Sequence, residues 1–202
     1  MLLNLVMLVR YKTIKTVNNL TIDEINEVKQ LLIKFHPPIY TDIFNMGLNV
    51  GLRISELLSI RFDNIKDGSL GVNETKTKKT KHVSLNNTAL KVVTKRRAQY
   101  PDDEYVFTSH ANRSTGVDAV STRAVRRIFE HIAQSLNIRF NTHSMRKTFL
   151  TNVYNKSGFN LALVMSVSGH SSKKELLRYL GLPSPSIPSL DVVDAYHEYE
   201  IK

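Results

Sequence analysis

The sequence predicts an α+β domain that is mainly α-helical and contains one small antiparallel β-hairpin. Apolar residues recur with helical spacing through most of the stretch from residue 21 to residue 180. Near residues 68–85 the pattern changes to the alternation that is typical of strands, with Asp67-Gly68 as a turn signal before it. The length of 202 residues, 42% of them hydrophobic and 23% charged, suits one domain with a sizeable core.

Helical segments are expected at residues 21–36, 40–49, from 52 onward, 86–99, 121–136, 143–156, 160–167 and 173–180. The first has the clearest start, because Thr21 is followed three residues later by Glu24, which is the spacing of a capping box. Its apolar face is expected to run from Ile22 to Phe35, and Pro37-Pro38 ends it. The segment 121–136 has the most regular apolar face, with arginines on the opposite side.

The strand-like region consists of two short segments around a basic turn. Leu70 and Val72 alternate with small or polar residues, and residues 82–85 read as the returning strand. The turn between them, residues 76–81, carries four lysines. A further short buried strand is expected at residues 105–107.

The chain divides into three expected parts: a leader at 1–20, a compact domain at 21–182, and a Pro/Ser-rich linker with a tail at 183–202. The apolar run at the start is too short for a membrane span and lacks the flanking features of a signal peptide. The sequence contains no cysteine, which excludes disulfides and thiolate metal sites. We therefore expect a cytoplasmic protein.

The charge balance points to a polyanionic partner. Lys and Arg number 28 against 18 Asp and Glu, a net charge of +10, and the isoelectric point is near 9.8. Such an excess favours attraction to nucleic acid. A soluble protein that is merely basic remains the alternative at this level.

Three local motifs carry candidate chemistry. They are Gly51-Leu52-Arg53-Ile54-Ser55-Glu56-Leu57, then Thr142-His143-Ser144-Met145-Arg146, then Ser168-Gly169-His170 with Tyr179 nine residues further on. Each motif alone is weak, since an H-x-x-R or a Gly-His pair arises readily by chance. Their order and spacing together are much more specific.

This arrangement resembles the tyrosine recombinase family, which includes phage integrases, Xer recombinases and Fim-type invertases. The family signature is an Arg in a G-L-R-x-x-E-L helix start, a Lys on a β-hairpin, an H-x-x-R, a Gly-His or Gly-Trp, and a nucleophilic Tyr about nine residues further on. All five occur here in that order, over about residues 21–182. The resemblance implies the catalytic-domain fold of these DNA breaking-rejoining enzymes, in a compact single-domain form or as part of a longer integrase.

The residues suit attack on a DNA phosphate without metal or cofactor. Guanidinium groups match phosphate oxygens in pairs, so Arg53 and Arg146 would hold the charge of the transition state. Through the resemblance His143 and His170 would donate to the phosphate, and one of them would help to deprotonate Tyr179, the nucleophile. Glu56 would support Arg53.

The remaining role is the general acid, which in the family is a hairpin lysine. Counting back from Val83-Ser84-Leu85, where family members place Val-Pro-Leu, the match falls on Lys76, with Lys78 as the alternative. Three hairpin lysines are expected to bind DNA phosphates: Lys78, Lys79 and Lys81. Arg126, Arg127 and Lys147 could add phosphate contacts, although an exposed arginine face is more often simply solvated.

The expected function is site-specific recombination, as an integrase or invertase, through a covalent 3′-phosphotyrosine. The expected partners are double-stranded DNA carrying recombination sites and further copies of the chain, in a tetramer on the DNA. The C-terminal tail would dock on a neighbouring protomer or fold back on its own domain. A type IB topoisomerase and a catalytically silent DNA-binding regulator remain alternatives.

Overall fold

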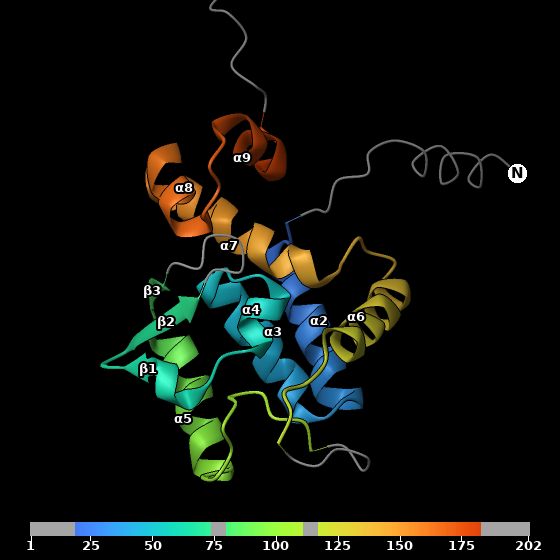
Figure 1. Cartoon of the computed structure of the whole chain (residues 1–202). Coiled ribbons are helices and arrows are strands. Elements are labelled where there is room, and N and C mark those ends of the chain that lie inside the picture. The colour runs from blue at the N-terminus through green and yellow to red at the C-terminus, as the bar shows by residue number, and fades with distance from the viewer. Residues whose placement is uncertain (1–18, 74–79, 111–116, 183–202) are drawn as a thin grey trace, which may run out of the picture.

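The computed structural model describes residues 19–73, 80–110 and 117–182, and these form a mainly helical fold with one small sheet (Figure 1). Its helices are α2 (Ile22–Phe35), α3 (Pro38–Val50), α4 (Ile54–Leu58), α5 (Asn87–Gln99), α6 (Thr122–Leu136), α7 (Thr142–Lys156), α8 (Leu161–Ser168) and α9 (Lys173–Leu180). The strands are β1 (Ile65–Lys66), β2 (Ser69–Asn73) and β3 (Thr80–Ser84), with a short 3-10 helix at Phe62–Asn64 before them. The expected fold class is confirmed.

The helices begin and end for identifiable local reasons. Thr21 caps α2 through the expected capping box with Glu24. Pro37 precedes α3, whose first residue is also a proline, and the left-handed Gly51 ends that helix at a φ of 63°. The face of α2 is narrower than expected, because Ile22 and Phe35 at its two ends are exposed while Val28 and Leu32 are fully buried.

The sheet has the order β1-β2-β3 and is antiparallel throughout. Leu70 pairs with Val83 in the β2–β3 register, and Asn73 pairs with Thr80. The expected strand at 105–107 is not formed. Tyr105 makes an isolated bridge to Arg61 instead, although Val106 and Phe107 are fully buried as predicted.

Two hydrophobic clusters form the interior, and we call them the large core and the small core. The large core lies among α2 to α6, the sheet and the first half of α7. At its centre Phe44, Phe129 and Phe140 meet, with ring centroids 4.6 to 6.1 Å apart. The small core consists of Leu150, Val164, Leu176 and Leu180.

Helix α7 belongs to both cores. Its Met145 packs in the large core, whereas Leu150, five residues later, packs in the small one. Figure 1 shows α8 and α9 at the far end of α7, beyond the body formed by α2 to α6. The residues of the candidate site are spread over both parts, so α7 sets how the two halves of the site meet.

Candidate active site

Helix α7 packs closely against two glycines, Gly47 of α3 and Gly51, which ends that helix. A Cβ atom on Gly47 would lie 2.5 Å from the Met145 sulfur, and one on Gly51 would lie 2.1 Å from the Phe149 ring. Both distances are far too short for real atoms, so a larger residue at either position would force the Met145 or Phe149 side chain to shift. The approach brings the carbonyl group of Gly51 to Arg146.

Arg146 is held by backbone oxygens from two parts of the molecule. Its Nη1 donates to the carbonyl of Gly51 and its Nη2 to the carbonyl of Ser168, both at 2.6 Å. Only 4% of the residue is exposed. Burial lowers the pKa of Arg146, and the neighbouring Arg53 lowers it further, while Tyr179 and Glu56 oppose the change. A charged group in such a dry position interacts strongly with any anion that reaches it.

Arg53 is oriented by Glu56 at the start of α4. The backbone N–H of Arg53 donates to Oε2 of Glu56 at 2.8 Å, and its Nη1 donates to Oε1 at 2.9 Å. The Glu56 side chain is 7% exposed, whereas that of Arg53 is 45% exposed. A buried carboxylate therefore holds a guanidinium whose outer side faces solvent.

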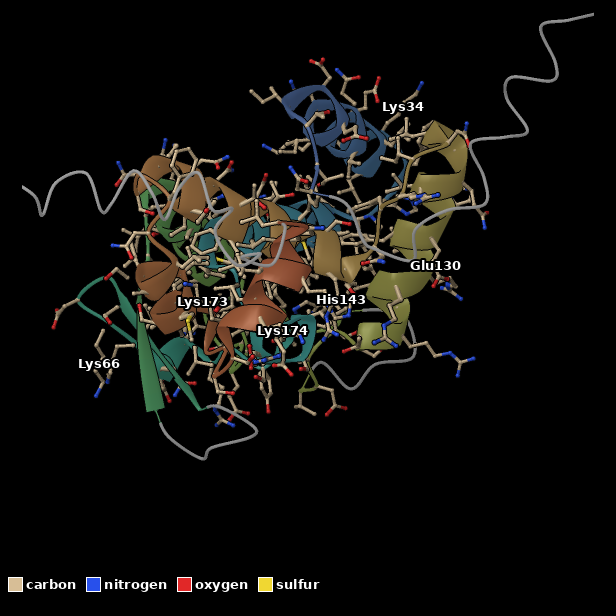
Figure 2. The ribbon with its side chains drawn as sticks, turned by 90° about the horizontal axis from the view of Figure 1, so that it is seen from above. Lys34, Lys66, Glu130, His143, Lys173 and Lys174 are labelled. Carbon is tan, nitrogen blue, oxygen red and sulfur yellow. The ribbon has the colours of Figure 1, made fainter. Side chains whose placement is uncertain are left out.

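His143 lies on the first turn of α7 and is exposed. In the view from above its side chain projects between α9 and α6 (Figure 2). Burial of part of the ring lowers its pKa, and the charges of Arg126, Arg146 and Arg53 lower it further. The imidazole thus lies among three guanidiniums, which favour its neutral form.

His170 follows the left-handed Gly169 that ends α8. Its Nδ1 lies 2.7 Å from the hydroxyl oxygen of Ser168. Its ring centroid lies 5.3 Å from that of Tyr179, with the rings tilted by 44°. The second imidazole is therefore placed directly beside the predicted nucleophile.

Tyr179 lies on α9, the short helix capped by Ser172 and ended by Gly181. Its ring packs against the small core. Among the described residues no group meets the full geometry of a hydrogen bond to the buried Tyr179 hydroxyl, although the Arg146 guanidinium lies near enough to favour its ionised form. Burial raises the pKa of Tyr179, while the charges of Arg146 and Arg53, which are close enough to act on it, lower it. The hydroxyl is consequently protonated at neutral pH, and a phenol in that form is a weak nucleophile.

The structure thus gathers six of the predicted site residues in one place, namely Arg53, Glu56, His143, Arg146, His170 and Tyr179. The predicted general acid Lys76 lies outside the described residues, as do Lys78 and Lys79. Lys81 is placed in β3, opposite Val72, by its backbone.

Lys147 differs from the exposed position that the sequence suggested. It is 5% exposed, and burial lowers the pKa of its ammonium group. Its Nζ would lie 3.7 Å from a Cβ on Gly181, at the carboxyl end of α9. The residue therefore packs inward against the end of the helix that carries Tyr179.

Sequence reasoning also missed Ser168, which bonds to both Arg146 and His170. The only signal in the sequence was its position two residues before His170, and a serine at such a position does not indicate a particular function.

The chemistry of the whole site is that of an anion pocket beside a tyrosine: two guanidiniums, two imidazoles and a protonated phenol. Within residues 19–73, 80–110 and 117–182, no three His, Asp or Glu side chains are grouped as metal ligands would be.

The sequence of this chain matches a known protein family and two curated proteins. The Phage integrase family matches residues 18–183. Among curated proteins the probable integrase/recombinase YoeC of Bacillus subtilis is 27% identical over 164 residues, which is 80% of this chain and 87% of YoeC. Tyrosine recombinase XerC of Caldanaerobacter subterraneus is 25% identical over 133 residues, which is 64% of this chain and 37% of XerC.

Solved structures share the fold at low sequence identity. The integrase of transposon Tn1549 in complex with circular intermediate DNA superposes with a TM-score of 0.69 at 16% identity, covering 93% of this chain and 67% of that one. The recombinase XerH bound to difH gives 0.66 at 17% identity, covering 95% and 57%. A lambda integrase dimer bound to a core site gives 0.66 at 19%, covering 88% and 53%.

The chain thus spans little more than half the length of the XerH and lambda integrase chains. Among the described residues, no helix is both long enough and apolar enough to cross a membrane. The matches confirm the expected class of enzyme, the tyrosine site-specific recombinases. By its sequence over residues 18–183 and by its fold, this chain belongs to the phage integrase family.

Proposed function

We propose that this chain cuts and rejoins DNA strands at specific sites through a covalent 3′-phosphotyrosine intermediate on Tyr179. The observation that carries the proposal is the convergence of Arg53, Arg146 and His170 on the Tyr179 side chain. A tyrosine that merely packs has no need of two guanidiniums beside its hydroxyl.

In the proposed reaction the scissile phosphate lies between the two arginines. Arg146 has fixed backbone partners and Arg53 is fixed by Glu56, so neither must reorganise when charge develops on the phosphate oxygens. The Tyr179 oxygen attacks the phosphorus, and the bond to the 5′ oxygen breaks. Lys76 donates a proton to that leaving oxygen. Rejoining is the same step in reverse, with a 5′-hydroxyl as the nucleophile.

The proposed substrate is double-stranded DNA with recombination sites, and the proposed active assembly is a homotetramer on that DNA. The net charge of +10 supports the first part, because each lysine or arginine that neutralises a phosphate releases counterions. The solved complexes of XerH with difH and of lambda integrase with a core site support it as relatives of the same fold.

A covalent-trapping assay tests the central step. Nicked suicide duplexes that tile the DNA flanking the coding region serve as probes, and adducts that survive denaturation are detected on a gel. We expect an adduct with the natural chain and none with Tyr179→Phe. The matched control is Tyr154→Phe, on α7, whose ring packs against Phe159 and which should react normally. An adduct that persists in Tyr179→Phe would contradict the assignment.

The alternatives give different results in the same set of assays. A silent regulator would bind the duplexes in a gel-shift assay and form no adduct on any of them. A type IB topoisomerase would relax supercoiled plasmids that carry none of the flanking sequence. A site-specific recombinase forms its adduct on one segment and not on scrambled DNA.

The general acid is tested by changing the leaving group. A duplex with sulfur in place of the bridging 5′ oxygen leaves as a thiolate, which needs no proton near neutral pH because a thiol is far more acidic than an alcohol. We expect Lys76→Ala to lose adduct formation on the oxygen substrate by about 100-fold or more, and to recover it on the sulfur substrate. Recovery of Lys78→Ala instead would move the assignment to Lys78.

A further inference from the structure

A pocket lies at the carboxyl end of α5, where this helix meets the junction between α2 and α3. Its cavity has a volume of about 250 Å³. Of the described residues that line it, none belongs to the candidate active site. Figure 1 shows α5 at the opposite end of the molecule from α8 and α9, the part that carries Tyr179. The pocket is therefore separate from the place where the proposed chemistry occurs.

The wall of this pocket contains a buried cation, Arg96, which is 3% exposed. Its Nε donates to the carbonyl oxygen of Val106 at 3.2 Å, and its guanidinium carbon lies 4.5 Å from the centre of the Tyr100 ring. Among the described residues, Nη2 of Arg96 has no hydrogen-bond partner. Because a buried donor without an acceptor is costly, the unused N–H groups of Nη2 indicate that an acceptor is missing.

The charge of Arg96 is also unbalanced. In the part of the chain that the structure describes, no Asp or Glu forms an ion pair with it. Two acids of the adjoining segments have other partners, since Asp103 pairs with His110 at 2.9 Å and Asp42 pairs with Lys95 at 2.9 Å. A buried charge without a counter-charge is unfavourable, so an anion that entered the pocket would offset this cost.

Much of the remaining wall is apolar. Pro37, Pro38 and Ile39 come from the junction of α2 and α3, and Val120 comes from the segment that precedes α6. Burial of such surface is favourable only against an apolar group, so the walls favour a ligand with an apolar body over inorganic phosphate. The volume is smaller than that of pockets for drug-sized molecules, roughly 300 to 1,000 Å³, so the ligand must be small.

We propose that this pocket binds a small organic acid, whose carboxylate is held by Arg96 and whose apolar body lies against the Pro37-Pro38 pair. A guanidinium presents N–H groups in pairs that match the two oxygens of a carboxylate. Such an acid is ionised at neutral pH, so it supplies both the missing acceptor and the missing negative charge. The binding is non-covalent and does not depend on the proposed recombination reaction.

Four probes separate the two parts of this recognition. Benzoate has a carboxylate and an apolar body, benzamide keeps the body without the charge, acetate keeps the carboxylate without the body, and inorganic phosphate is an anion with no apolar part. Each is titrated into nitrogen-15-labelled full-length protein at constant ionic strength, and amide NMR shifts are followed. We expect benzoate to give saturable shifts at residues 99–100 and 108–110. The affinity of each other probe should be lower by about tenfold or more.

Two neighbouring arginines of α5 supply a matched pair of variants, Arg96→Met and Arg97→Met. Arg97 also lies against an aromatic ring, with its guanidinium carbon 3.7 Å from the centre of Phe62, but it is not part of the pocket wall. We expect the affinity for benzoate to fall about 10- to 100-fold in Arg96→Met, as for lost hydrogen bonds to a charged group, and to stay unchanged in Arg97→Met. Arg96→Lys keeps the charge without the paired N–H groups and should be intermediate. Circular dichroism checks that each variant is folded.

Each contrary result removes a different part of the proposal. No saturable shift at the pocket with benzoate would overturn the site itself. Equal affinity for benzoate and benzamide, or equal benzoate affinity in Arg96→Met and the natural chain, would overturn the role of Arg96. Phosphate or acetate binding as tightly as benzoate would overturn the class of ligand. If Arg96→Met does not fold, the comparison of benzoate with benzamide in the natural chain decides. None of these measurements uses DNA, so they stand even if the proposed function fails.

Discussion

The two halves of the site are supported very differently. Arg53 and Arg146 are fixed next to the large core, through Glu56 and through the Gly51 carbonyl where α7 crosses α3. Tyr179 is carried by an eight-residue helix whose anchor is the small core, with four buried residues. Since burial of apolar area is the main source of stability, the two arginines should be much harder to displace than Tyr179. Fixed charge beside a more easily displaced Tyr179 would suit the proposed reaction, in which a covalent bond to DNA is made and then broken.

The largest effect is expected from the centre of the large core. Phe44→Ala removes the ring that packs between Phe129 and Phe140, and we expect the free energy of unfolding to fall by about 3 to 5 kcal/mol. Chemical denaturation followed by circular dichroism measures it. Ile33→Ala, on the exposed side of α2, is the control and should change stability by less than about 0.5 kcal/mol. A small effect of Phe44→Ala would remove the contrast between the cores.

The next effect is expected from the small core. Leu176→Ala empties a fully buried position at a cost of about 2 to 5 kcal/mol, but we expect the loss to be local. Amide hydrogen exchange should accelerate in α8 and α9 and much less in α3 and α6, and adduct formation should slow. Leu163→Ala, a half-exposed leucine of α8, is the control. Equal acceleration in all helices would show that the two cores unfold as one.

A smaller effect is expected from Glu56, which holds the Arg53 side chain in position. Glu56→Gln keeps the shape of the side chain but removes the charge that binds Arg53 through two nitrogens. Because a hydrogen bond to a charged group contributes about 1.5 to 3 kcal/mol, we expect adduct formation to slow about 10- to 100-fold. Exchange in α8 and α9 should stay unchanged. Glu130→Gln, an exposed glutamate of α6 that Figure 2 labels, is the control. An unaffected rate would mean that Arg53 needs no support from Glu56.

The smallest effect is electrostatic. Arg126 is one of the charges that lower the pKa of His143, so Arg126→Gln should raise that pKa, and an NMR titration measures the change. A group with a lowered pKa in the folded state binds fewer protons there than in the unfolded chain, so its contribution to stability falls as pH drops through its unfolded value of about 6.5. This pH dependence should weaken in Arg126→Gln. Arg123→Gln, exposed on the same helix, is the control, and an equal shift there would assign the effect to net charge.

Local sequence signals predicted the elements well. The Thr21–Glu24 capping box and the Pro37-Pro38 pair between α2 and α3 are short-range features, and they act within a few residues of where they stand. One wrong prediction was the strand at 105–107. This apolar run is buried, but no continuous partner strand lies beside it. Burial could be predicted from its composition, whereas pairing depends on which segment lies alongside.

The sequence by itself determined the chemical groups of the site and their order, because residue type and spacing are properties of the chain. Only the tertiary structure decided which groups orient them. Arg146 is held by two backbone carbonyls 95 and 22 residues away, and a backbone oxygen has no sequence signature. The inward position of Lys147 and the contact of Ser168 with His170 likewise depend on how α7, α8 and α9 pack. Tyr179 is recognisable from its spacing, but the groups that surround its hydroxyl are set by contacts between distant segments.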